Sequence, residues 1–243
     1  MFDQNLPTYI HTFETYPRWK TFQSEHYIFH YFAESEAEKD LEHIVKTQES
    51  AYQKIITTLK LDNPGKLIEY YFYPNEATKT ALMGDDWYAQ AILNEFRVHV
   101  LYTKKDKPLG EHEDTHLLSL PWGLSFGLFN EGLAESMVGH AWDGTPHLAY
   151  VKEGYAKGMY PALSELMDHQ GWLNSPEDGR VMYWYSLVGA FTAFLIQQFG
   201  IECFGKLYRN TRRENTKEQN STVFQSVYGK TISEVEEVFK NFR

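Results

Sequence analysis

The first hundred residues alternate between short aromatic segments and one long amphipathic segment, which predicts strands and helices in mixed order. Residues 27–32 and 67–73 are dense in Tyr, Phe and Ile, as is typical of strands. Between them, apolar residues recur at three- and four-residue steps over about 34–61, which predicts a long helix. We also expect a short helix at 76–83 and a third strand at 96–102.

Every segment that can be assigned after Leu109 has a helical pattern. Residues 181–199 are apolar nearly all round, which predicts a buried helix, and the last helix begins with a capping box formed by Thr231 and Glu234. The pattern predicts an α+β fold in which a small N-terminal mixed sheet and its long helix pack against a helical C-terminal half. We expect a single domain over 1–243, with an α/β subdomain at 1–105 and a helical subdomain at 106–243.

Candidate chemistry is concentrated in His112-Glu113-Asp114-Thr115-His116, within a helix expected to begin around 108–110. Two histidines four residues apart lie on one helix face, so both imidazoles can reach a single ion at about 2.0–2.1 Å. Glu113 projects about 100° away from His112, where its carboxylate can take a proton from a metal-bound water. The alternative interpretation is a surface helix that carries two histidines and a solvated run of acidic residues.

A second segment, Asn130-Glu131-Gly132-Leu133-Ala134-Glu135, favours the metal interpretation. Catalytic zinc sites typically use three protein ligands and leave one position to water, so one ligand is still required. We expect Asn130 to be the N-cap of a helix, which would place Glu131 in its first turn. Residues 120–123 can act as a hinge between two antiparallel helices, so Glu131 is the candidate third ligand.

The two segments together resemble the gluzincin metallopeptidases, in which a His-Glu-x-x-His helix precedes Asn-Glu-Gly-x-Ala-Glu. Residues 185–200 are similar to the long helix that follows the zinc helices in the peptidase MA-like family, and the order of elements is similar over about residues 20–243. The resemblance implies a zincin-like domain with the zinc helix at the boundary of its two halves. It also implies one Zn²⁺ per chain, held by His112, His116 and Glu131, with Glu113 as the general base.

The same resemblance assigns two supporting roles. Glu135 matches a carboxylate that supports a ligating histidine, although it could instead be an exposed helix glutamate. Tyr185 is the candidate donor to the oxyanion of the reaction, or else an aromatic residue of the core. His140, His147 and His169 could donate in its place, or could face solvent or cap helices.

Three further points follow from the comparison with gluzincins. Their strand before the zinc helix often borders the cleft, so we expect 96–102 to offer an exposed edge to an extended substrate. Asp114 departs from the motif, because the residue after the base is usually uncharged. Its side chain should point about 200° from His112, away from the metal, which leaves open how deeply the back of that helix is buried. The short spacer before Glu131 also differs from the large aminopeptidases and favours compact members.

Charge and composition argue against several other classes of protein and of metal site. The net charge of −10 and the pI near 5.5 argue against a nucleic-acid partner, and the short cluster of Arg209, Arg212 and Arg213 is interpreted as a solvated patch. The single cysteine, Cys203, rules out an intramolecular disulfide and a zinc site made of thiolates. The N-terminal residues lack the pattern of a signal peptide and no segment reads as membrane-spanning, so we expect a cytoplasmic protein that does not associate with a membrane.

The sequence therefore predicts a zinc-dependent metallopeptidase that hydrolyses peptide bonds in a peptide or protein substrate, through a zinc-bound water activated by Glu113. Two alternatives stay open. One is a catalytically silent, peptidase-like binding domain, and the other is a zinc amidase that acts on a non-peptide amide. The sequence distinguishes neither endo- from exopeptidase cleavage nor one oligomeric state from another.

Overall fold

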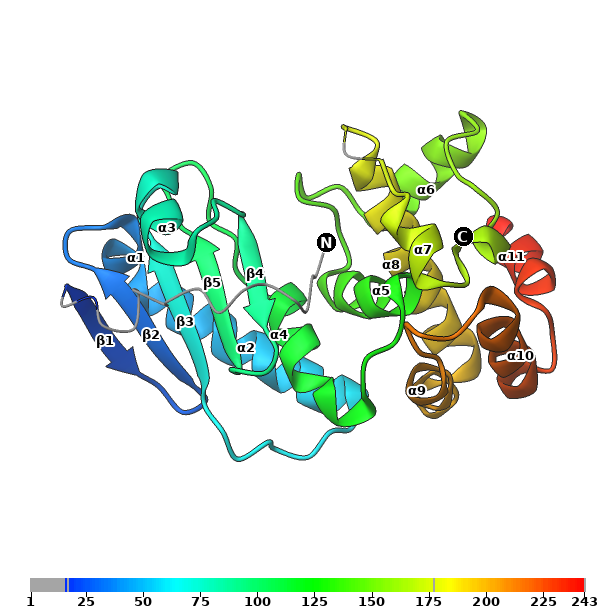
Figure 1. Cartoon of the computed structure of the whole chain (residues 1–243), viewed down its shortest axis with the longest axis horizontal. Coiled ribbons are helices and arrows are strands. Elements are labelled where there is room, and N and C mark those ends of the chain that lie inside the picture. The colour runs from blue at the N-terminus through cyan, green and yellow to red at the C-terminus, as the bar shows by residue number, and fades with distance from the viewer. Residues whose placement is uncertain (1–15, 17, 177, 243) are drawn as a thin grey trace. The chain divides into compact units, whose positions relative to one another are not determined.

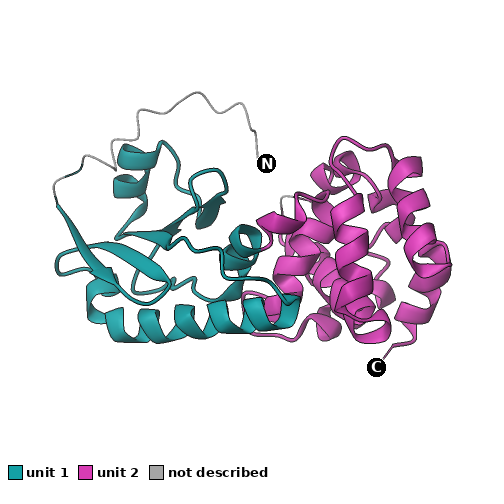
Figure 2. Ribbon diagram, turned by 90° about the horizontal axis from the view of Figure 1, so that it is seen from below, with its two compact units in different colours: residues 1–118 teal, residues 119–243 magenta. Residues whose placement is uncertain are grey.

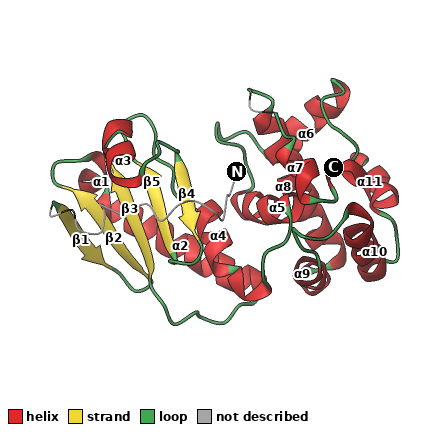
Figure 3. Cartoon of the chain, in the orientation of Figure 1, coloured by secondary structure: helices red, strands yellow, loops and turns green. Residues whose placement is uncertain are grey.

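The chain divides into two compact units, 1–118 and 119–243 (Figure 2). The computed structural model describes residues 16, 18–176 and 178–242. As predicted, the fold is α+β, with a small mixed sheet in the first unit and a helical second unit (Figure 3). The first unit ends at Leu118, so the helix that carries His112 and His116 belongs to it.

The first unit is built around one sheet and its helices (Figure 1). In chain order its elements are β1 (Trp19–Gln23), β2 (Tyr27–Phe32), α1 (Glu36–Lys39), α2 (Leu41–Leu59), β3 (Ile68–Tyr73), α3 (Glu76–Met83), β4 (Ala89–Ile92), β5 (Arg97–Leu101) and α4 (Glu111–Leu118). The structure confirms the strands expected at 27–32, 67–73 and 96–102 and the short helix at 76–83. Strands β1 and β4 were not predicted.

The sheet has the strand order β1-β2-β3-β5-β4, in which β2, β3 and β5 are parallel and the two outer strands are antiparallel to their neighbours. The expectation that 96–102 offers a free edge is wrong, because β5 pairs on both sides. His99 of β5 lies opposite Tyr71 of β3 and opposite Gln90 of β4. The edge strand next to β5 is therefore β4, which packs against α4.

The helix expected over 34–61 is divided in two. The side chain of Ser35 caps α1 by accepting a hydrogen bond from the Glu38 backbone nitrogen at 3.2 Å. Asp40 then leaves the helical conformation, with φ −97° and ψ 8°, and α2 begins at the next residue. The break at Asp40, which makes no side-chain capping hydrogen bond, therefore separates a short polar helix from the long amphipathic one.

One face of the sheet packs against α2 and forms the core of the first unit. Tyr27 of β2 meets Tyr52 of α2 edge to face, with ring centroids 6.1 Å apart, and its hydroxyl oxygen lies 2.9 Å from the backbone oxygen of Gln48. Large aromatic side chains dominate this layer and exclude water over a wide area. The fully buried aromatic residues of β2 and β3 on this face are Tyr27, Phe29, Tyr70 and Phe72.

The opposite face carries a stack of alternating histidine and tyrosine rings. The ring of Tyr71 lies 4.1 Å from that of His30 and 4.9 Å from that of His99, nearly parallel to both. Glu69 lies beside the stack, where it accepts from His30 Nε2 at 3.1 Å and from the Tyr71 hydroxyl at 2.8 Å, with Arg97 Nε 3.6 Å away. The hydrogen bond from His30 contributes most to lowering the pKa of Glu69 to about 2.

The second unit is helical among its described residues. Its elements are the 3₁₀ helix η1 (Leu120–Trp122), α5 (Gly127–Val138), α6 (His147–Ala156), the 3₁₀ helix η2 (Leu163–Leu166), α7 (His169–Leu173), α8 (Val181–Phe199), α9 (Ile201–Asn210), α10 (Lys217–Tyr228) and α11 (Ile232–Lys240). The buried helix predicted at 181–199 is confirmed as α8. The capping box of the last helix is also confirmed, since Thr231 and Glu234 each accept from the other's backbone nitrogen.

Helices α5 and α8 approach each other closely because glycine lies at their contact. A Cβ atom on Gly132 of α5 would lie 2.3 Å from Thr192 Oγ1 and 2.8 Å from the backbone oxygen of Val188, both in α8. A Cβ atom on Gly189 of α8 would lie 2.6 Å from Cβ of Glu135. Neither position therefore accepts a larger residue without moving a helix.

Among the residues that the structure describes, no helix combines the length and the apolar character that crossing a membrane requires.

Candidate metal centre

Helix α4 places the two motif histidines together, as the four-residue spacing predicts. The ring centroids of His112 and His116 lie 5.0 Å apart. His112 and Glu113 are partly exposed, whereas His116 is buried. A ligand pair and an adjacent carboxylate therefore share one helix, with the carboxylate open to water.

Helix α4 begins at Glu111, slightly later than the expected start at 108–110. Gly110 precedes it with φ +104°, in a region that non-glycine residues rarely adopt. Its backbone nitrogen donates to Oε1 of Gln48 at 2.7 Å, so α2 supplies the acceptor at the start of α4. At the surface, Lys54 Nζ lies 2.7 Å from Oε1 of Glu111.

The side of α4 that carries Asp114 is deeply buried, a point that the sequence left open. The Asp114 side chain has no solvent exposure, and its carboxylate accepts from the hydroxyls of Tyr27 and Tyr70, each at 2.6 Å. Gln48 Nε2 donates to the same carboxylate at 3.1 Å. Burial outweighs these hydrogen bonds and raises the pKa of Asp114 to about 7.

The three partners of Asp114 were not predicted from the sequence. They come from β2, β3 and α2 and lie between 44 and 87 residues away along the chain. The alternation of β3 indicates which of its tyrosines face α2, but no sequence signal pairs them with an aspartate on a later helix.

In the second unit, α5 begins at Gly127, so the expectation that Asn130 is its N-cap is wrong. Phe126 occupies that position, and Glu131 lies in the second turn of the helix. The Asn130 side chain instead donates to Oε1 of Glu131 at 3.1 Å and accepts from the Tyr208 hydroxyl at 2.9 Å. All three side chains are buried, so Tyr208 and Asn130 restrict the rotation of the Glu131 carboxylate.

Glu135 is 2 % exposed, so the interpretation as an exposed helix glutamate is wrong. Its Oε2 atom lies 3.2 Å from Nε2 of His147, which is also buried and whose Nδ1 lies 3.1 Å from Oγ of Ser186. The interpretation of His147 as a solvent-facing residue is therefore wrong as well. Within the second unit, Glu135 has a histidine partner that is not one of the motif histidines.

Tyr185 lies among aromatic residues, although it is partly exposed. Its ring centroid is 5.2 Å from that of Trp172 and 5.8 Å from that of Trp142. Trp142 is 67 % exposed, so this aromatic group reaches the surface of the unit.

His169 and His140 have different surroundings. His140 is exposed, and its Nδ1 lies 2.9 Å from the backbone oxygen of Ala141. His169 begins α7, and its Nδ1 is buried without a hydrogen-bond partner among the described residues. Burial chiefly lowers the pKa of His169; Arg213 acts in the same direction and Glu131 in the opposite one. Arg213 and Glu131 therefore both lie close enough to His169 to affect its charge.

A second group of possible ligands lies in the first unit. Ligand atoms of Glu25, His26 and Glu49 all fall within 4.8 Å of one another. However, Glu49 is already engaged: Oε2 accepts from His26 Nδ1 at 2.6 Å, and Oε1 accepts from Ser24 Oγ at 2.6 Å. The His26 ring also stacks on Tyr52 at 3.8 Å. These contacts describe a completed polar cluster, which fits a metal ion poorly.

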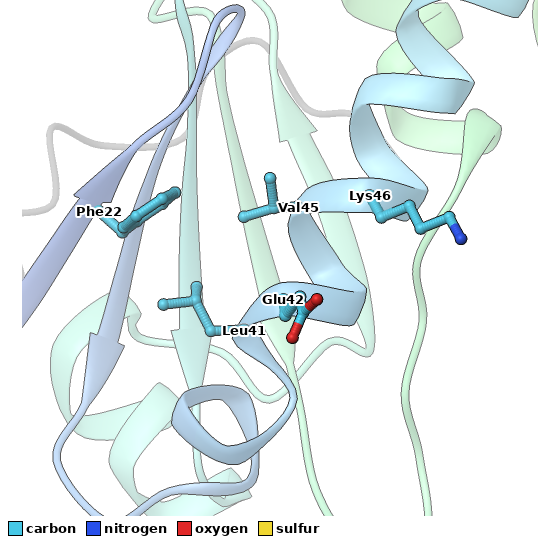
Figure 4. A pocket seen from close by; sticks show the side chains of 5 residues that line it. All are labelled: Phe22, Leu41, Glu42, Val45 and Lys46. Atoms are coloured by element: carbon cyan, nitrogen blue, oxygen red, sulfur yellow. The ribbon is translucent and has the colours of Figure 1, made fainter.

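The first unit also has a surface hollow of about 380 Å³ between β1 and α2 (Figure 4). None of the motif residues lines it. Its walls are mainly apolar, and its lining residues are Phe22, Leu41, Glu42, Val45 and Lys46. The hollow is therefore separate from the candidate chemistry on α4.

A scan against protein-family models gives no match, and a search of curated proteins finds no relative of this chain. The resemblance to gluzincins rests on the two motifs and on the order of elements.

Proposed function

We propose that this protein is a zinc-dependent metallopeptidase of the gluzincin type with a zincin-like fold. The observation that carries the proposal is the pair of imidazoles on α4, 5.0 Å apart, with the partly exposed Glu113 beside them. In this proposal His112, His116 and Glu131 hold one Zn²⁺. The proposal requires that α5 of the second unit brings Glu131 to α4.

The donor set fits zinc by its chemistry. Two neutral imidazoles and one carboxylate form a ligand set that catalytic zinc sites use, and they leave a coordination position for water. Asn130 and Tyr208 support this assignment, because they orient the Glu131 carboxylate within its own unit.

When bound, zinc lowers the pKa of a coordinated water towards about 7 and polarises the carbonyl of the substrate. Glu113 then accepts a proton from the attacking water and returns it to the leaving nitrogen. Its partial exposure suits this role, because a base must reach both water and substrate. An extended peptide would pair with β4, which borders the sheet next to α4.

The donor to the oxyanion has two candidates in the second unit. His169 shares its surroundings with Glu131, and its lowered pKa keeps the ring neutral at pH 7, with one N–H to donate. Tyr185 carries a hydroxyl that resemblance favours, although its ring packs between Trp142 and Trp172. Separate Tyr185→Phe and His169→Gln variants would identify the donor by a loss in kcat with little change in zinc content.

Metal content tests the site directly. We expect elemental analysis of protein purified without added metal or chelator to give about one zinc per chain. Glu131→Ala should lose most of this zinc, whereas Glu165→Ala, at an exposed position of the same unit, should keep it. A wild-type chain that contains no zinc and takes up none would refute the proposal.

Activity tests the base. On a peptide library, Glu113→Gln should reduce kcat/KM by about 10²–10⁴-fold and keep the zinc. Glu111→Gln is the matched control, because it removes a carboxylate two residues away that pairs with Lys54 at the surface. Zinc binding without cleavage of any amide would favour a binding domain. Cleavage of non-peptide amides alone would favour an amidase.

A further inference from the structure

Asp114 connects α4 to both layers of the first unit. Its Oδ1 atom accepts from the Tyr70 hydroxyl, and its Oδ2 atom accepts from the Tyr27 hydroxyl and from Gln48 Nε2. These donors belong to β3, β2 and α2. One carboxylate is thus fixed to two strands and to the long helix, with no exposure to solvent.

Gln48 adds a second point of attachment. Its Oε1 atom accepts from the backbone nitrogen of Gly110, the residue before α4, and its Nε2 atom also lies 2.8 Å from the Tyr70 hydroxyl. Contacts at the start of the helix and at Asp114 together determine both the position of α4 along its axis and its rotation about that axis. A single contact would leave the rotation free.

Rotation matters because Asp114 and the histidines lie on opposite sides of α4. Turning the helix by about 20° would move imidazole nitrogens, roughly 6 Å from the axis, by about 2 Å. A metal site tolerates only about 0.2 Å in its ligand distances. An apolar residue at position 114 would pack in the same layer, but it would make no directional contact to oppose such a turn.

We propose that Asp114 is a positioning residue for the metal site, whose hydrogen-bonded carboxylate holds α4 at the rotation that presents His112 and His116 to one ion. The inference rests on the proposed function and deepens it. The motif position that departs from the gluzincin pattern is thereby assigned a role in metal binding, without contact to the metal.

The test is zinc affinity, measured by competition with a chromophoric chelator at one fixed pH on the full chain. Asp114→Leu should weaken zinc binding at least about tenfold, and Asp114→Asn, which keeps the shape and one acceptor oxygen, should stay within about threefold of wild type. The visible absorption of the Co²⁺-loaded protein should change in Asp114→Leu and stay close to that of wild type in Asp114→Asn.

A matched control separates positioning from stability. Ile55→Ala removes buried apolar volume from the layer between α2 and the sheet but no hydrogen bond. It should destabilise the fold and leave zinc affinity unchanged. If Asp114→Leu fails to fold, the double variant Tyr27→Phe/Tyr70→Phe keeps the carboxylate and nearly all the volume, and it should also bind zinc more weakly.

The outcomes are distinct. Wild-type zinc affinity in folded Asp114→Leu, or in the double variant, would overturn the inference and leave the proposed function standing. An equal loss of affinity in Ile55→Ala would also overturn it, since stability alone would then explain the effect. A wild-type chain that binds no zinc would overturn the proposed function, and the inference with it.

Discussion

The two helices that carry the candidate ligands are held in place by different means. Helix α4 is fixed from behind by a polar cluster, in which a fully buried Asp114 accepts from two tyrosines and a glutamine. Helix α5 is fixed by contact with α8, where Gly132 lies so close to Thr192 that no Cβ atom fits between them.

This difference determines which changes each helix tolerates. A hydrogen-bonded cluster is sensitive to the loss of a partner, because a buried polar group is then left without one. A close glycine contact is sensitive to added volume and indifferent to charge. The packing of the two ligand helices should therefore be destabilised by different substitutions.

The largest effect is expected in the second unit, from Gly132→Ala. Its Cβ atom would meet Thr192 Oγ1 at 2.3 Å and the Val188 carbonyl oxygen at 2.8 Å, and a backbone atom cannot move without moving α8. We expect the free energy of unfolding in denaturant to fall by about 3 kcal/mol.

The control for this substitution is Gly179→Ala, where an added Cβ atom meets nothing within 4 Å. It should change stability by less than about 0.5 kcal/mol. Equal stability of the two variants would contradict the close packing of α5 and α8.

A smaller effect should appear in the first unit as a pH dependence of stability that arises from Glu69. The folded-state pKa of Glu69, about 2, lies below its ordinary value of 4.5, so its contribution to stability is present above pH 4.5 and is lost as the pH falls towards 2. With its side chain 28 % exposed, we expect this contribution to be about 2 kcal/mol.

Glu69→Gln should therefore flatten the dependence of unfolding free energy on pH between 4.5 and 2. Glu25→Gln, at a side chain that is 81 % exposed, should leave the dependence unchanged. Parallel curves for wild type and Glu69→Gln would show that the contacts of Glu69 do not stabilise the fold.

The contribution of Asp114 to stability depends on pH in the opposite direction. Its folded-state pKa of about 7 lies above its ordinary value of 3.8, so this contribution is present below pH 3.8 and is lost as the pH rises through 7.

Substitutions of two tyrosines close together in β3 allow the polar cluster around Asp114 to be compared with the opposite face of the sheet. Tyr70→Phe removes a donor from the fully buried Asp114, and we expect a loss of about 1.5 kcal/mol in unfolding free energy. Tyr71→Phe should cost about 0.5 kcal/mol, because Glu69 keeps its contacts with His30 and Arg97. Equal losses from the two variants would mean that burial of the acceptor does not control the cost.

The sequence predicted those elements whose signals are local. Residues 181–199 form α8 with the expected bounds, because a largely apolar segment is followed by a glycine, and 76–83 form α3 between Asn75 and Gly84. Strand β4 was missed, because Ala89-Gln90-Ala91-Ile92 is short and lacks β-branched density, and its pairing with β5 is a tertiary property.

In the candidate site, too, only the features that depend on local spacing could be predicted. A spacing of four places His112 and His116 on one face from sequence alone, and the structure confirms it. The start of α5 was misplaced because Asn130 is a good N-cap type, whereas the apolar residues before it already belong to the helix. The buried partners of Asp114 could not be predicted, because they depend on which face of the sheet α4 covers.

The smallest effect is expected from Lys54→Ala, which removes the ion pair with Glu111 at the start of α4. The lysine side chain is 47 % exposed, and a solvated ion pair of this kind contributes less than about 0.5 kcal/mol. The thermal unfolding temperature should therefore be nearly unchanged. Any effect should be weaker still in high salt, because salt screens the ion pair. A loss as large as that in Tyr70→Phe would mean that surface charge, and not the buried cluster around Asp114, holds α4 against α2.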